Sequence, residues 1–161
     1  REIGNEETSA PAPPPPATSG AGLLGTYFNG TTLGGTALFT RIEAVDFNWG
    51  TGAPRSGAPV DNFSVRWTGT VTVPTTGNYR FRTLSDDGVR LWIGGTQRIN
   101  NWTDHGTTTD TSASFRLTAG QKVAVRLEYY EKGGGSEIRL QWQVPGSSSY
   151  VTVPASRLNA Q

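Results

Sequence analysis

Apolar and polar residues alternate along most of the chain, with the period of two that is typical of a β-strand with one buried face. The alternation covers residues 63–67, 79–83, 89–93, 123–129 and 138–144, and glycine, proline and threonine turns separate the runs. Shorter strand candidates lie at 23–28, 45–49, 112–117 and 151–154, whereas 34–41 and 100–110 look like loops. Many short strands with evenly spaced turns predict an all-β sandwich, jelly roll or barrel.

The first 21 residues have a different character. Residues 10–17 read APAPPPPA, which predicts an extended polyproline II segment, and 18–22 is a flexible glycine-containing joint. We therefore divide the chain into a Pro-rich linker or arm, residues 1–21, and a β-domain, residues 22–161. Self-association through residues 1–20 is a further expectation, since an extended arm can dock on a neighbouring subunit.

Composition narrows the classes of function. The formal net charge is +1, which gives no electrostatic reason to expect nucleic acid as a partner. The chain has no cysteine, so a disulfide framework and a thiolate metal site are excluded. No apolar run is long enough to cross a bilayer, so membrane insertion is not expected, and the sequence shows no signal peptide. Abundant Gly, Thr and Ser with little Lys favour a secreted or cell-surface protein.

The most informative stretch is the turn Ser85-Asp86-Asp87-Gly88, which joins two strand candidates. A hard cation such as Ca²⁺ takes several oxygen ligands, and two adjacent carboxylates could supply some of them. Successive side chains of a regular strand point to opposite faces, so a shared ion requires an irregular backbone at this pair. The alternative is a structural turn whose acids simply face solvent.

An ordered series of motifs resembles one known family. These motifs are LGTYF (24–28), FSVRWTG (63–69), GNYRF (77–81), SDDGVRLWIGG (85–95), NWTDHG (101–106), LTAGQ (117–121), RLEYY (126–130) and IRLQW (138–142). Together they are similar to the protective-antigen-type (PA-fourteen) domain, which occurs in a bacterial toxin component, in fungal flocculins and adhesins, and beside glycosidases. The resemblance covers about residues 22–158 and implies a two-sheet antiparallel β-sandwich, jelly-roll-like, after the Pro-rich arm.

The resemblance also implies a metal site. In sugar-binding members a calcium ion sits on an Asp-Asp pair joined by a cis peptide, and Asp86 and Asp87 match that pair. A family Asn ligand falls on Glu131 here, which is a departure, and two backbone-carbonyl ligands fall near Gly133 and Gly135. The resemblance thus implies Ca²⁺ as cofactor, held by these five residues.

The function expected from the resemblance is an extracellular calcium-dependent carbohydrate-binding module, of lectin or adhesin type. A hexose with vicinal hydroxyls would complete the calcium shell at Asp86 and Asp87, with Trp92 either stacking on the sugar or covering the sheet. The alternative is a structural or assembly module in which residues 1–20 dock on a neighbouring subunit.

An enzyme is not expected. Glycoside hydrolysis needs two carboxyl groups free to act across the bond, and acids that hold a metal are not free to do so. No motif of a serine hydrolase, a zinc protease or a phosphate loop is present. The adjacent pair Asp104 and His105 is read as loop structure, because no nucleophile accompanies it.

Overall fold

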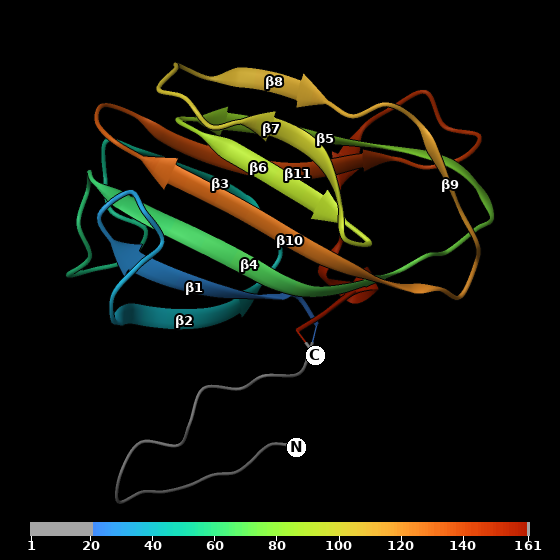
Figure 1. Cartoon of the computed structure of the whole chain (residues 1–161), viewed down its shortest axis with the longest axis horizontal. Helices are drawn as coiled ribbons and strands as arrows, with labels where there is room; N and C mark the ends of the chain where they lie inside the picture. Colours follow the sequence, from blue (N-terminus) through green and yellow to red (C-terminus); the bar gives the residue numbers. More distant parts are fainter. Residues whose placement is uncertain (1–20, 161) are drawn as a thin grey trace, which may run out of the picture.

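The computed structural model of the chain describes residues 21–160, and within them two antiparallel sheets face each other (Figure 1). No α-helix occurs in the described residues; one turn of 3₁₀-helix, Ala155–Arg157, lies near the C-terminus. The strands are β1 (Leu23–Asn29), β2 (Ala37–Glu43), β3 (Asp46–Gly50), β4 (Phe63–Thr72), β5 (Gly77–Asp86), β6 (Val89–Ile93), β7 (Thr96–Asn101), β8 (Thr108–Thr111), β9 (Phe115–Leu117), β10 (Lys122–Glu131), β11 (Ser136–Gln143), β12 (Val151–Thr152) and β13 (Leu158–Asn159).

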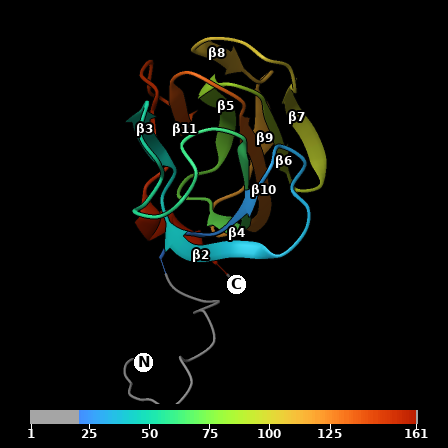
Figure 2. The same ribbon diagram turned by 90° about the vertical axis from the view of Figure 1, so that its left-hand side faces the viewer.

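The larger sheet has the order β2-β1-β4-β10-β6-β7, and β13 also pairs with β4. The smaller sheet has the order β12-β11-β5-β8, with β3 paired to β11 and β9 paired to β5. Figure 2 shows the same molecule after a quarter turn, with β3 and β11 of the smaller sheet on the left and β6 and β7 of the larger sheet on the right. The all-β prediction and the two-sheet sandwich that the resemblance implied are therefore confirmed.

The core lies between the sheets and follows the period-two pattern of the sequence. Val65 and Trp67 of β4 are fully buried, whereas Arg66 between them is partly exposed. Aromatic rings join the layers: Trp49 of β3 lies 5.9 Å from Phe63 and 6.4 Å from Tyr129, both on the larger sheet. These contacts hold the ends of β4 and β10 against the smaller sheet, and the candidate site is at these ends.

Two segments that were expected to be loops contain strands. Residues 34–41 contribute to β2, and 100–110 contain the end of β7 and most of β8. Both β2 and β8 lie at sheet edges, and none of their residues is fully buried. Strands that bury neither face lack an apolar alternation, which explains why the pattern missed them. The Pro-rich arm expected at residues 1–21 lies almost entirely outside the described residues.

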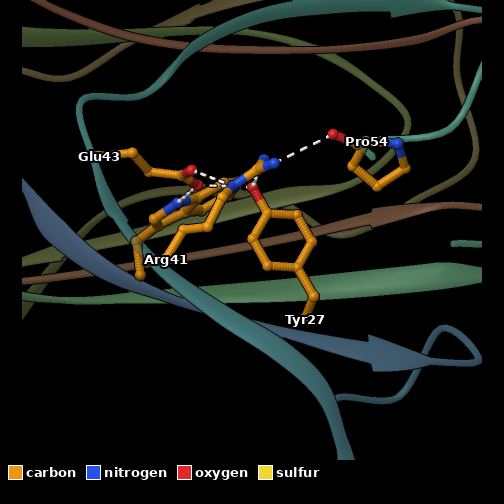
Figure 3. A network of polar contacts seen from close by, with 5 residues as sticks. Tyr27, Arg41, Glu43 and Pro54 are labelled. Carbon is orange, nitrogen blue, oxygen red and sulfur yellow. Dashed lines mark hydrogen bonds and ion pairs between the residues drawn. The ribbon is translucent and has the colours of Figure 1, made fainter. Parts of the chain in front are cut away.

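A buried polar network fastens the edge strand β2 to its neighbours (Figure 3). The Glu43 carboxylate accepts hydrogen bonds from the hydroxyl of Tyr27 (2.5 Å) and from the indole N–H of Trp67 (2.8 Å). Arg41 pairs with the same carboxylate at 2.6 Å and also donates to the carbonyl of Pro54 at 3.1 Å. Burial, with the nearby Glu43 charge, raises the pKa of Tyr27, so its hydroxyl remains a donor.

Candidate metal centre

The Asp86–Asp87 peptide is cis, so the irregular backbone expected at this pair is confirmed. Asp86 ends β5, and β6 begins at Val89. The hydroxyl of Tyr129, on β10, donates a 2.6 Å hydrogen bond to the carbonyl of Asp86. A core side chain of the larger sheet thus fixes the backbone of the acid pair on the smaller sheet.

Glu131 completes a group of three carboxylates. It is the last residue of β10, and one carboxylate oxygen from each of Asp86, Asp87 and Glu131 lies within 4.8 Å of the others. The Glu131 side chain is fully buried, and no group in residues 21–160 donates a hydrogen bond to either of its oxygens. A buried carboxylate without a donor is costly unless a proton or a cation accompanies it.

Burial and the neighbouring carboxyl groups raise the pKa values of two members of this group, Glu131 and Asp86. Burial, followed by the nearby carboxyl groups of Asp87, Asp61 and Asp86, raises the pKa of Glu131 to about 9. Burial and the Asp87 charge also raise the pKa of Asp86. At neutral pH the metal-free site therefore holds a proton on Glu131, and a cation would take the place of that proton.

Asp87 is held by backbone donors from two other segments. Its Oδ1 accepts a hydrogen bond from the N–H of His105 at 3.1 Å, and its Oδ2 accepts one from the N–H of Lys132 at 2.9 Å. These contacts orient the carboxylate while leaving each oxygen a lone pair. The β5–β6 turn, the β7–β8 segment and the loop after β10 thus meet at one side chain.

The glycine loop between β10 and β11 passes close to Asp86. A Cβ atom added at Gly135 would lie 3.7 Å from Oδ2 of Asp86, which places this loop residue beside the acids. The left-handed backbone falls on Gly134 (φ +83°) rather than on Gly133 or Gly135. Carbonyl ligation by Gly133 and Gly135 stays a prediction.

Trp92 is not brought to the carboxylates. Its ring lies on the outer face of the larger sheet, 4.1 Å from the guanidinium carbon of Arg126. No described contact connects the ring with Asp86, Asp87 or Glu131. Alternation along β6 correctly puts Trp92 opposite the buried Leu91, and the outer face is where it points.

A polar cluster beside the site was not expected from the sequence. The hydroxyl of Tyr130 donates to Asp104 at 2.5 Å, and Lys132 pairs with the same carboxylate at 3.3 Å. A Cβ atom added at Gly88 would meet the Tyr130 ring at 2.1 Å, so glycine is needed there for packing. Asp104 and His105 are loop structure, as expected: the His105 ring donates from Nδ1 to the carbonyl of Gly106 at 2.7 Å.

The fold and the site define a β-sandwich domain with a group of three acidic side chains at one end of its strands. A family model described as the PA14 domain matches residues 19–155, and the chain belongs to this family. Among solved structures, the PA14 domain of the MpAFP antifreeze protein has a TM-score of 0.74 at 20% identity, covering 96% of both chains. The PA14 sugar-binding domain of an RTX adhesin has a TM-score of 0.71 at 19% identity, covering 86% of this chain and 98% of its own. At these identities the likeness shows the fold alone.

Relatives that are more than 30% identical to this chain are named as anti-sigma factor proteins. The chain is 36% identical over 141 residues to the anti-sigma-I factor RsgI3 of Acetivibrio thermocellus, covering 87% of this chain and 21% of that protein. A solved anti-sigma factor domain-containing protein from Clostridium clariflavum has a TM-score of 0.80 at 36% identity, covering 98% of this chain and 52% of its own. The chain therefore spans about a fifth of the curated relative and about half of the solved one.

These relatives overturn two expectations from the sequence. The extracellular calcium-dependent lectin or adhesin was wrong as the main function, because the relatives above 30% identity are named as anti-sigma factor proteins. The secreted or cell-surface localisation was wrong on the same finding. The alternative, an assembly module docked through residues 1–20, is not tested, because this arm lies outside the described residues. The physical reason is that one fold serves many functions, so motifs that maintain the fold do not show which function a given protein has.

The expectations about enzyme activity and partners stand at a coarser level, whereas the calcium ion stays a prediction. The anti-sigma factor relatives and the adhesin-type PA14 neighbours are not enzymes by their descriptions. Some structural neighbours have been solved in complex with glycans. One is the A domain of epithelial adhesin 9 from Candida glabrata, in complex with Galβ1-3GlcNAc. It is 12% identical to this chain, with a TM-score of 0.69 over 91% of this chain and 92% of its own. Within residues 21–160, no helix is long and apolar enough to span a membrane.

Proposed function

We propose that this chain is a calcium-binding regulatory domain of an anti-sigma-factor-type protein. The observation that carries the metal part is the group of Asp86, Asp87 and Glu131, of which the last two are buried, with ligand atoms within 4.8 Å of one another and no donor on Glu131. The support for the regulatory part is the 36% identity to the anti-sigma-I factor RsgI3.

Calcium suits this donor set better than other common ions. The site offers carboxylate oxygens beside a glycine loop, and the group of candidate side-chain ligands contains neither cysteine nor histidine. Ca²⁺ accepts six to eight oxygens in irregular arrangements, whereas Mg²⁺ requires a near-ideal octahedron. Carbonyls of Gly133 and Gly135 are the expected further ligands. The ion would also neutralise the repulsion among three neighbouring carboxylates.

A bound ion would link segments that are distant in the sequence. Asp87 already receives N–H groups from His105 and Lys132, so an ion on Asp87 would stabilise the β7–β8 segment and the loop after β10 together. A ligand that prefers the ordered arrangement would then bind more tightly in the presence of the ion. This coupling is the kind of input that a regulatory domain passes to the rest of its protein.

The glycan partner expected from the sequence is tested in a separate binding experiment. Its support is the set of fold neighbours described with sugars, all below 20% identity. Soluble galactose- and glucose-containing disaccharides, added with and without Ca²⁺, would establish whether the pocket recognises vicinal hydroxyls. The regulatory proposal does not depend on that result.

The metal part is tested by calcium titration calorimetry and by thermal melting of the 161-residue chain. A ligand at about 100 times its dissociation constant adds about 2.7 kcal/mol, or roughly 5–10 °C in Tm for a domain of this size. We expect this rise for the natural chain and for Asp46→Asn, which alters an exposed ion pair with Arg139. We expect none for the double variant Asp86→Asn/Asp87→Asn. Equal behaviour of all three proteins would refute the metal site.

The regulatory part is tested by exchange of domains. This chain would replace the matching region of the anti-sigma-I factor RsgI3, with transcription from a sigma-I-dependent promoter as the readout. We expect the chimaera carrying Asp86→Asn/Asp87→Asn to change transcription relative to the unmodified chimaera, while Asp46→Asn does not. If metal binding is confirmed and transcription is identical in all three, the domain is a calcium-binding module without a regulatory role.

A further inference from the structure

The outer face of the larger sheet carries a second cluster of charged and aromatic side chains. Its charge is mainly positive, unlike that of the three carboxylates. Arg66 of β4 lies opposite Glu128 of β10, and Glu128 lies opposite Arg90 of β6. In the next outward-facing row, Arg126 of β10 lies opposite Trp92 of β6. We call Arg66, Arg90, Trp92, Arg126 and Glu128 the arginine face.

The arginine face has a net charge of +2, from three guanidinium groups and one carboxylate. The Glu128 side chain is 4% exposed and pairs with Arg66 at 2.8 Å and with Arg90 at 2.9 Å. Arg126 is 3.8 Å from the same carboxylate, near the limit of an ion pair. No other acid in the described part of the chain pairs with these arginines. Two positive charges therefore remain for a partner.

Aromatic rings hold two of the guanidinium groups in place. The guanidinium carbon of Arg126 lies 4.1 Å from the ring centroid of Trp92, and that of Arg90 lies 3.8 Å from the centroid of Trp102. A guanidinium stacked on a ring keeps its N–H edge available for a carboxylate. The side chains of Arg126 and Arg66 are 48% and 37% exposed, so these edges reach solvent.

A shallow groove of about 450 Å³ runs beside Trp92 and Arg126. Its lining includes the small residues Gly69 and Ala124 as well as Thr68. The groove can accommodate an apolar side chain next to the two free cationic edges. Trp and Arg around a central pocket are the residue types that contribute most at protein interfaces.

We propose that the arginine face is a docking surface for an acidic segment of a protein partner. Carboxylates of the segment pair with Arg126 and Arg66, and a neighbouring apolar side chain enters the groove beside Trp92. Charge complementarity selects this occupant, because planar guanidinium groups match carboxylates with two parallel hydrogen bonds. An uncharged sugar is disfavoured, because Arg126 already covers the Trp92 ring face on which a sugar would stack.

The test uses the full chain and a fluorescein-labelled peptide, Glu-Glu-Glu-Leu-Glu-Glu-Glu, with fluorescence anisotropy as the readout. EDTA is present throughout, so the outcome is independent of the metal centre. We expect binding at about 0.01 M salt, where the Debye length is about 30 Å, and weaker binding at about 0.15 M. We expect Arg126→Gln to weaken binding at least tenfold.

Arg80→Gln is the matched control, because Arg80 is an exposed arginine on the smaller sheet. It should leave the affinity unchanged, and the same peptide with Gln in place of Glu should not bind. Absence of binding at low salt, or equal losses for Arg126→Gln and Arg80→Gln, would overturn the proposal. Binding of a polyuronate through Arg126 without binding of the peptide would also overturn it, in favour of an acidic polysaccharide.

Discussion

The hydroxyl of Tyr129 donates a 2.6 Å hydrogen bond to the backbone carbonyl of Asp86, although the two residues belong to different sheets. The ring of Tyr129 is fully buried and lies 6.1 Å from Phe63 and 6.4 Å from Trp67. One side chain therefore belongs both to the core and to the candidate metal centre. Packing of the larger sheet fixes the backbone of the acid pair on the smaller one.

Tyr129→Phe is expected to weaken calcium binding several-fold while preserving the core. The ring remains, but the Asp86 carbonyl loses its donor, so the acid pair is held less firmly. Loss of one such hydrogen bond costs about 0.5–1.5 kcal/mol of unfolding free energy. Calcium titration calorimetry and urea denaturation measure the two effects.

Tyr79→Phe is the control that separates the effect on calcium affinity from the effect on stability. Tyr79 is equally buried, and its hydroxyl donates to the carbonyl of Thr75 at 2.6 Å, in a turn away from the three carboxylates. It should lower stability by a similar amount and leave the calcium affinity unchanged. A similar drop in calcium affinity for both variants would show that Tyr129 has no special part in the site.

Metal-free protein is expected to lose stability as the pH rises. Burial raises the pKa of Glu131 from 4.5 to about 9, so the folded state holds a proton that the unfolded state releases above pH 4.5. Stability from this group is therefore complete below about pH 4.5 and falls progressively up to about pH 9. The raised pKa of Asp86 acts in the same direction. Thermal melting in EDTA at pH 5, 7 and 9 measures the trend.

Glu131→Gln is the matched variant for this pH series, because glutamine has the same shape and no titrating proton. Its Tm should change less between pH 5 and pH 9 than that of the natural chain. In calcium, by contrast, the natural chain should gain more stabilisation at higher pH, since metal binding displaces the proton. Parallel pH curves for both proteins in EDTA would contradict the assigned role of Glu131.

Gly88→Ala is expected to destabilise the domain by about 1–3 kcal/mol, because the added methyl group would meet the Tyr130 ring at 2.1 Å and force it to move. Gly106→Ala, in the neighbouring β7–β8 segment, places its methyl group in open space and should change stability by less than about 0.5 kcal/mol. Urea denaturation of both variants provides the comparison. Equal stability of the two would mean that the turn after Asp87 adapts freely.

Glu43→Ala is expected to cost about 2–4 kcal/mol of unfolding free energy. It leaves the hydroxyl of Tyr27 and the indole N–H of Trp67 without their acceptor in a buried setting, and it unpairs Arg41. Asp46→Ala removes an acid of the same charge from an exposed pair with Arg139 and should cost less than about 1 kcal/mol. Similar chemical denaturation midpoints for the two variants would contradict this.

Periodicity was enough to predict the central strands, because strands such as β4 and β5 bury one face in the core. It could not predict β2, which buries neither face fully and is held by polar contacts of Arg41 and Glu43. No period-two signal exists for such an edge strand.

The acid pair could be found from the sequence because it lies in a tight connection between two strand candidates. The position of Glu131 came from a resemblance, since it follows Asp87 by 44 positions and only the sheet pairing brings them together. The donors on Asp87 could not be predicted at all, because they are backbone N–H groups of His105 and Lys132, which any residue type could supply.

The bridge between Ala21 and Asn159 joins the two ends of the described domain. Asn159 pairs with Thr70 of β4, whereas Glu131 lies opposite Phe63, so seven positions of β4, roughly 23 Å, separate the bridge from the metal centre. Tension carried by flanking chain would enter and leave the sandwich at neighbouring strands and act first on this bridge. The carboxylate end lies away from this load, so we expect Asp86, Asp87 and Glu131 to keep their arrangement under such tension.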